Sequence, residues 1–161
     1  MFIGQRHVVS ITTCTADRDR WLAEKPLAEI VREEVLRIHG DHPVLGYCLM
    51  PDHLHLLLCN AEVPVSRIMN LLKGRASRRI RQFGWEGVKP WLPSYWDHIV
   101  RRQEGLYTVL QYIFTNPVRA RLVKDWWEYP WLGSPMIGPV GPDFFGTAAP
   151  EDIMWSETLR V

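Results

Sequence analysis

Two histidines separated by one residue, His53 and His55, are the residues of this chain best suited to bind a metal ion. They lie in the apolar run HLHLLLCN (53–60), which is typical of a strand. Residues i and i+2 of a strand project from the same face, so both imidazoles can reach one cation. A catalytic site of this kind needs a further protein ligand from elsewhere in the chain. Taken alone, the pair is also explained as two ordinary surface or core histidines.

Tyr112 and Asn116 are a second pair of candidates. The segment LYTVLQYIFTNPV (106–118) has the apolar stripe of a helix, which Asn116-Pro117 is expected to end. The two residues are four apart, so they share a helix face if the helix persists to Pro117, and they lie largely off the apolar stripe. Individually, each is explained more simply: the tyrosine as an aromatic at the edge of the core and the asparagine as a helix cap.

The elements that position these candidates alternate along the chain. Strands are predicted at 7–15, 43–50, 53–60 and 94–102. Helices are predicted at 26–39, 65–84 and 105–115. Pro51-Asp52 is expected to form a tight turn, Gly40 and Gly84 to stop two helices, and Ser66 to be a candidate N-cap. This order predicts an α+β fold, a ferredoxin-like sandwich in which helices pack on an antiparallel sheet.

Composition limits the class of protein. A chain of 161 residues with 47% hydrophobic and 23% charged residues can bury a core of its own. No apolar run approaches the roughly 20 residues that span a bilayer, and the N-terminus lacks a signal-peptide stretch, so we expect a cytoplasmic protein without membrane contact. Three cysteines without CxxC spacing are expected to be small buried hydrophobic residues, namely Cys14, Cys48 and Cys59.

The C-terminal segment differs from the rest. Between residues 129 and 150, nine of 22 residues are Gly or Pro, which excludes regular helix or central strand. We therefore expect one domain at 1–125, followed by an extended tail at 126–161. The tail is too aromatic to be a freely solvated linker and is expected to pack against the body or a partner chain. Its aromatic residues include Trp126, Trp127, Trp131, Phe144, Phe145 and Trp155.

Positive charge is concentrated although the total formal charge is only +1. Between Val63 and Trp85 there are six basic residues and no acidic one, and a second basic group occupies residues 101–124. Such segments can bind phosphates, although a basic helix is about equally well explained as a solvated face. The cations that could meet a polyanion in this way are Lys73, Arg75, Arg78, Arg79, Arg81, Arg101, Arg102 and Arg119.

Four segments in order resemble the REP-associated tyrosine transposases, which are single-tyrosine HUH transposases of the insertion-sequence type. They are MPDHLHLLL (50–58), the basic helix, PSYWDHIVRR (93–102) and YIFTNPVRARLV (112–123), and the resemblance covers about residues 5–135. It implies that His53, His55 and Asn116 bind a divalent metal and that Tyr112 attacks DNA. It also implies that the cations named above contact DNA. Exposed tryptophans such as Trp85, Trp91 or Trp96 could stack on its bases, although most of the eight are needed for the core. Arg121 replaces the glycine usual in this family, an exchange expected to cost little at a solvated junction.

The resemblance also implies a reaction and a substrate. The protein would cleave single-stranded DNA near hairpins through a 5′-phosphotyrosine and rejoin it, and it would associate with the nucleoid. Imidazole and amide ligands suit Mg²⁺ or Mn²⁺, although imidazoles also admit Zn²⁺. Asp52 is expected to be a turn residue outside the catalytic set, and the role of His98 is open.

Several alternatives stay open at this stage. The site lies within one chain or across a homodimer, and the sequence does not decide between them. A host-adopted regulator would bind nucleic acid without cutting it. A metallohydrolase of small substrates would use the histidines but leave the basic helix without a role.

Overall fold

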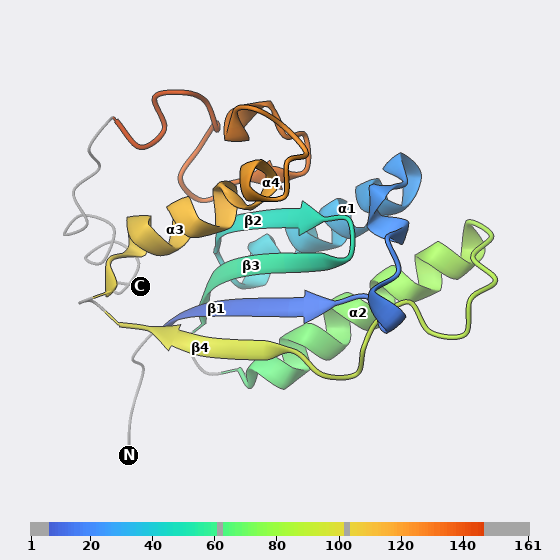
Figure 1. The fold of residues 1–161 in the computed structure, drawn as a ribbon. Helices are drawn as coiled ribbons and strands as arrows, with labels where there is room; N and C mark the ends of the chain where they lie inside the picture. The colour runs from blue at the N-terminus through green and yellow to red at the C-terminus, as the bar shows by residue number, and fades with distance from the viewer. Residues whose placement is uncertain (1–6, 61–62, 102–103, 147–161) are drawn as a thin grey trace, which may run out of the picture.

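Four antiparallel strands and one short edge strand form the centre of the protein. The computed structural model describes residues 7–60, 63–101 and 104–146. The strands are β1 (His7–Cys14), β2 (Val44–Met50), β3 (His53–Asn60), β4 (Trp96–Val100) and β5 (Leu132–Gly133). They are ordered β4-β1-β3-β2-β5, and every neighbouring pair is antiparallel (Figure 1). The predicted hairpin at Pro51-Asp52 joins β2 to β3.

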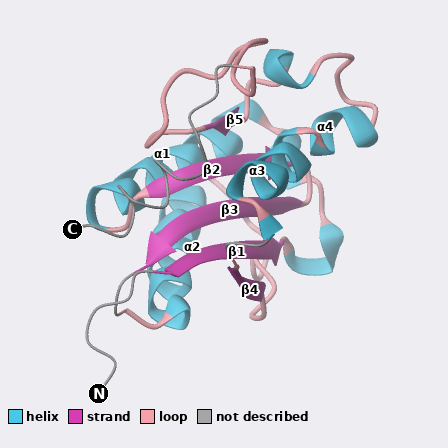
Figure 2. Ribbon diagram, turned by 90° about the vertical axis from the view of Figure 1, so that its left-hand side faces the viewer, coloured by secondary structure: helices cyan, strands magenta, loops and turns pink. Residues whose placement is uncertain are grey.

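Helices cover both faces of this sheet. On one face lie α1 (Lys25–Asp41) and α2 (Val65–Gln82); on the other lies α3 (Leu106–Phe114), with α4 (Asn116–Arg119) after it (Figure 1 and Figure 2). Three short 3-10 turns complete the described elements: η1 (Ala16–Arg18), η2 (Trp21–Ala23) and η4 (Trp126–Glu128). The α+β ferredoxin-like sandwich predicted from the sequence is confirmed.

Two helix ends differ from the sequence prediction. Gly40 does not stop α1, which continues through Asp41. Ser66 does not cap α2, because Pro64 occupies the N-cap position and no side chain caps it. The helix that carries Tyr112 ends at Phe114, within one residue of the prediction. Asn116 then begins a new short helix with Pro117 in its first turn, where proline is well tolerated.

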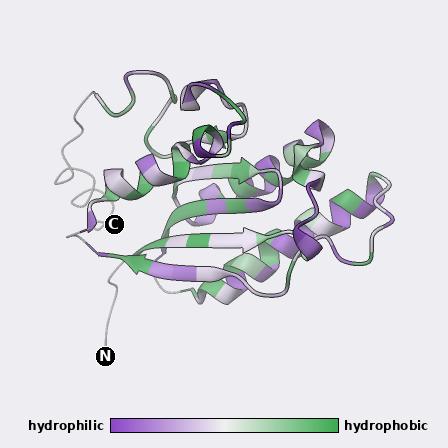
Figure 3. Cartoon of the chain, in the orientation of Figure 1, coloured by the Kyte–Doolittle hydropathy of each residue, from purple (hydrophilic) through white to green (hydrophobic). Residues whose placement is uncertain are grey.

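Alternation along β3 divides its side chains between two hydrophobic cores. Leu54, Leu56 and Leu58 are fully buried against α1 and α2, whereas Leu57 belongs to the core under α3. Because β3 is covered on both faces, it reads as an almost continuous apolar run, visible as the green part of the strand in Figure 3. His53 and His55 have the same parity as Leu57, so the sheet directs them toward the α3 side.

The described part of the tail packs on the body. Phe114 stacks on Trp126 at a centroid distance of 5.6 Å and lies 5.6 Å from Phe144. The Ser134 hydroxyl donates to the Leu45 carbonyl at 2.6 Å. Residues 126–146 therefore extend the core under α3 and hold the end of the helix that bears Tyr112, while Trp155 lies outside the described residues.

Two further predictions concern burial and membranes. All three cysteines are buried and unpaired by disulfides, as predicted. Among the residues that the structure describes, no helix is both long and apolar enough to cross a bilayer.

Candidate active site

The two histidines of β3 converge on one point. Their Nε2 atoms lie 3.1 Å apart, and their rings are nearly perpendicular, with an interplanar angle of 88°. This arrangement follows from the two-residue repeat of the strand, which turns both side chains toward α3. Two imidazole nitrogens this close together can share a single bound cation.

Each imidazole is held from behind through its Nδ1 atom. The Nδ1 of His53 lies 2.6 Å from the Asp52 carboxylate, and the Nδ1 of His55 lies 2.9 Å from the Thr12 hydroxyl. When an imidazole binds a metal through Nε2, its Nδ1–H usually donates to such a partner, which fixes the tautomer and the ring orientation. Asp52 lies in the turn between β2 and β3, as predicted, and is in addition a positioning partner of His53. The sequence gives no sign that Thr12 has the same relation to His55.

His55 is held in its neutral form. Burial lowers the pKa of His55 to about 3, with smaller contributions in the same direction from His53 and Arg119. The neutral imidazole is the state that binds a metal ion. The burial of His55 therefore keeps its imidazole in the protonation state that can bind a metal ion.

Tyr112 lies beside this pair on α3. Its ring centroid is 6.3 Å from that of His55, and the residue is 58% exposed, so an external substrate can reach it. The Arg119 guanidinium lies over the ring at 4.3 Å and donates to the Tyr112 carbonyl at 2.8 Å. It also donates to the Thr115 hydroxyl at 2.6 Å. One cation is thereby fixed beside the phenol.

Asn116, the first residue of α4, is hydrogen-bonded to the end of α3. Its amide nitrogen donates to the carbonyls of Tyr112 at 3.1 Å and Ile113 at 3.3 Å. With the nitrogen engaged, the amide oxygen is the atom of this side chain that can coordinate a cation. Among the described residues, no third His, Cys, Asp or Glu joins the histidine pair in a metal-binding group. Within the described part of the chain, the amide oxygen of Asn116 is a candidate for a further ligand of another type.

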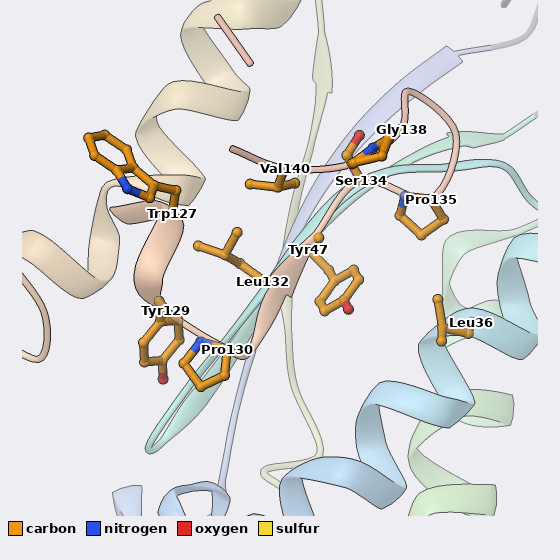
Figure 4. Close-up of a pocket in the computed structure, with 12 residues that line it drawn as sticks. Leu36, Tyr47, Trp127, Tyr129, Pro130, Leu132, Ser134, Pro135, Gly138 and Val140 are labelled. Atoms are coloured by element: carbon orange, nitrogen blue, oxygen red, sulfur yellow. The ribbon is translucent and has the colours of Figure 1, made fainter. Parts of the chain in front are cut away.

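A cavity of about 610 Å³ opens beside Tyr112 and His55. Residues from β1, β3, β4 and α3 line it: Ser10, Thr12, His55, Trp96, Asp97, His98, Glu104, Thr108, Val109, Tyr112 and Ile113. A second cavity, of about 490 Å³, lies between α1, β2 and the segment after α4 (Figure 4). Its lining holds no charged side chain and none of the predicted site residues. Of these two cavities, the first is the one that contains predicted catalytic and metal-binding residues, namely Tyr112 and His55.

Lys73 and Arg79, two of the expected DNA contacts, are held by several partners within the protein. Lys73 is buried, and its ammonium donates to the carbonyls of Leu92, Pro93 and Ser94 at 2.8, 3.3 and 3.0 Å. Arg79 donates to Glu34 at 2.8 Å and also to Glu33, both on α1. To bind a phosphate, each of these two cations would have to give up some of these contacts, so their contact with DNA stays a prediction.

The other predicted contacts are divided between two faces. Arg75, Arg78 and Arg81 are exposed on α2, across the sheet from Tyr112. Arg101 is exposed after β4, Arg119 lies at Tyr112, and Arg102 lies outside the described residues. The cations of α2 therefore cannot reach a phosphate that is bound at Tyr112.

Arg121 has a left-handed backbone, with φ of 58°. A residue with a Cβ is strained in this conformation, whereas glycine is not. The exchange of glycine for arginine at this junction therefore costs more than expected from the sequence.

Residues 5–116 match the family model described as transposase, IS200-like. A protein of Haemophilus influenzae provisionally named a REP-associated tyrosine transposase is 28% identical over 102 residues, which are 55% of this chain and 58% of that protein. A REP-associated tyrosine transposase of Escherichia coli is 22% identical over 105 residues, 61% of each chain. The chain thus spans about three fifths of the length of these curated relatives.

Two solved structures have the same fold. A REP-associated tyrosine transposase bound to a REP hairpin superposes with a TM-score of 0.67 and 17% identity over 82% of this chain and 79% of that chain. A provisionally identified transposase of Deinococcus radiodurans gives a TM-score of 0.50 and 24% identity over 67% of this chain and 88% of that chain. Both likenesses concern the arrangement of the sheet and its helices.

Proposed function

This chain belongs to the family of IS200-like transposases, and we propose that it is a DNA nicking and rejoining enzyme that uses Tyr112 as its nucleophile. Its substrate is single-stranded DNA beside a hairpin. The observation that carries this proposal is the placement of an exposed tyrosine beside two converging imidazoles, one of them kept neutral by burial. Each element of that arrangement serves phosphodiester chemistry.

The donor set fits a divalent cation. The two Nε2 atoms point at each other, both Nδ1 atoms are held, and Asn116 offers an amide oxygen. His53, His55 and Asn116 would hold Mg²⁺ or Mn²⁺, and imidazole would also accept Zn²⁺. Bound there, such an ion would polarise a phosphate and orient the scissile bond.

Tyr112 performs the bond exchange. Its phenolic oxygen attacks phosphorus and loses its proton, an O–P bond to the tyrosine forms, and the bond from phosphorus to the 3′-oxygen breaks. The departing 3′-oxygen takes up a proton and leaves as a hydroxyl. Attack of a 3′-hydroxyl on the phosphotyrosine reverses these changes, so rejoining needs no nucleotide hydrolysis. Arg119, fixed over the ring, would pair with the phosphate.

The arginines of α2 supply a second contact with nucleic acid. Arg75, Arg78 and Arg81 are exposed, and paired phosphates of a hairpin stem suit a row of cations. A solved relative of the same fold is bound to a REP hairpin, which supports this class of partner. Binding to chromosomal hairpins would also keep the protein on the nucleoid.

The decisive experiment uses labelled single-stranded DNA that contains a hairpin from the genomic neighbourhood of the gene. It is incubated with the protein in Mn²⁺ or in EDTA and resolved on a denaturing gel. We expect a metal-dependent protein–DNA adduct that Tyr112→Phe abolishes. Tyr107→Phe, which removes the same hydroxyl type from the same helix, is the matched control and should keep the adduct.

The main competing function is a regulator that binds DNA without cutting it. It is favoured by the position of the α2 arginines, which can bind nucleic acid independently of Tyr112. Tight hairpin binding with no adduct or cleavage in any divalent metal would support the regulator and overturn the enzyme.

A further inference from the structure

We propose that the cavity beside Tyr112 is a base pocket that takes one unpaired base next to the scissile phosphate, stacked on Trp96 and read by Glu104. The pocket is formed by Trp96, His98, Glu104, Thr108 and Val109. Its preferred occupant is a base with an exocyclic amino group, namely guanine, adenine or cytosine. This inference rests on the proposed function, because it assumes a single strand at Tyr112.

The strand register places Trp96 in line with the histidines. Thr12 of β1 pairs with His55 on one side and with Trp96 on the other. Directly paired residues share a face of the sheet, so Trp96 lies on the same face as His55, two strands away. That separation is about 10 Å, within reach of the nucleotide next to the one attacked.

Trp96 is unusually open for a large aromatic residue. It is 73% exposed and lies on β4, a strand at the edge of the sheet. Val109 and Ile113 of α3 line the same cavity and give it an apolar wall. An exposed indole facing an apolar wall can hold a flat nucleobase by stacking, whatever the base.

The charge of the lining residues indicates which part of the DNA, base or phosphate, can occupy the cavity. Glu104 is an acidic residue of the cavity lining, and a carboxylate repels a phosphate. Arg119, the cation fixed at Tyr112, is not among its lining residues. The phosphate therefore has a place at Arg119 and the base a separate place between β4 and α3.

Glu104 can also select the base. Its carboxylate lies 3.4 Å from the Nε2 of His98, which holds it at the rim of the cavity. A carboxylate accepts hydrogen bonds and donates none, so it favours an amino group and disfavours the carbonyl oxygens of thymine. This gives His98, whose role the sequence left open, a positioning function.

The test measures base entry and adduct formation separately. Substrates carry fluorescent 2-aminopurine, or each natural base, at the positions flanking the cleavage site. We expect wild-type protein to quench 2-aminopurine at one position, and Trp96→Ala to lose the quenching and to slow adduct formation roughly tenfold. Ile99→Ala, which removes an exposed apolar side chain on the same strand but of opposite parity, should match the wild type.

The base preference is tested with Glu104→Gln. The wild type should form adducts about tenfold faster with an amino-bearing base than with thymine at that position, and the amide, which donates as well as accepts, should reduce this preference. Equal quenching and equal rates for Trp96→Ala and Ile99→Ala would overturn the base pocket while leaving the enzyme intact. Absence of any adduct from the wild type would overturn the proposed function instead. In that case the fluorescence alone decides the base pocket.

Discussion

Arg79 should act as a structural residue rather than as a DNA contact. The Glu34 side chain that it meets is only 1% exposed, with Arg79 at 2.8 Å and Arg37 at 3.3 Å from Oε1. The other carboxylate oxygen, Oε2, is buried without a hydrogen-bond partner in the described structure. Arg79 is therefore the main counter-charge of a carboxylate buried between α1 and α2.

Replacing Arg79 by Met keeps the apolar stem and removes the charge. Breaking a buried ion pair typically costs about 3–5 kcal/mol. Arg79 is 28% exposed and Arg37 remains, so we expect about 2 kcal/mol. For a domain of this size that lowers the Tm by roughly 4–8 °C, measurable by thermal unfolding followed by circular dichroism.

The neighbouring exposed residue supplies the control. Arg78→Met should change stability by less than about 0.5 kcal/mol but weaken hairpin binding and reduce its salt dependence by about one released counterion. Adding Glu34→Leu to Arg79→Met should recover most of the lost stability, because the buried charge is then gone. If Arg79→Met melts like the wild type and binds DNA as weakly as Arg78→Met, the ion-pair reasoning is wrong.

Three further outcomes are expected. Arg121→Gly should raise the free energy of unfolding by about 0.5–1 kcal/mol in urea titrations because it relieves a left-handed backbone, and a loss of stability would contradict this. Asp52→Ala should weaken Mn²⁺ binding at least about tenfold by calorimetry because His53 loses its partner, whereas unchanged affinity would exclude a positioning role. The hydrogen bond from Arg79 lowers the pKa of Glu33 below its ordinary 4.5, so this pair stabilises the protein above that pH and the contribution is lost as the pH falls through and below it. Glu33→Gln should therefore flatten the stability profile between about pH 5 and 3, and an identical slope would refute the effect.

The sequence predicts the features that depend on local periodicity. The two-residue repeat of β3 is enough to put His53 and His55 on one face, and the helical repeat around Tyr112 gives its helix. Both patterns depend only on residues close together in the sequence, so they can be recognised without knowing how the chain folds.

What the sequence does not predict depends on contacts between distant segments. Thr12 is 43 residues from His55 and is identified only through the register of β1 with β3. The acidic partners of Arg79 come from α1, so the absence of acids around α2 in the sequence was misleading. The strand β5 is only two residues long, too short for an alternating hydrophobic pattern. It is defined by its backbone pairing with the edge of β2.

The division of the α2 arginines and Tyr112 between the two sides of the sheet sets a minimum length for any DNA that touches both. Each helix layer lies about 10 Å from the sheet, so the two sites are at least about 20 Å apart. At about 3.4 Å for each stacked nucleotide, this straight-line separation alone corresponds to roughly six nucleotides of stacked strand, and the path around the edge of the sheet is longer. The thickness of the sheet and its two helix layers would then set the smallest number of nucleotides between the base of the hairpin and the cleavage position.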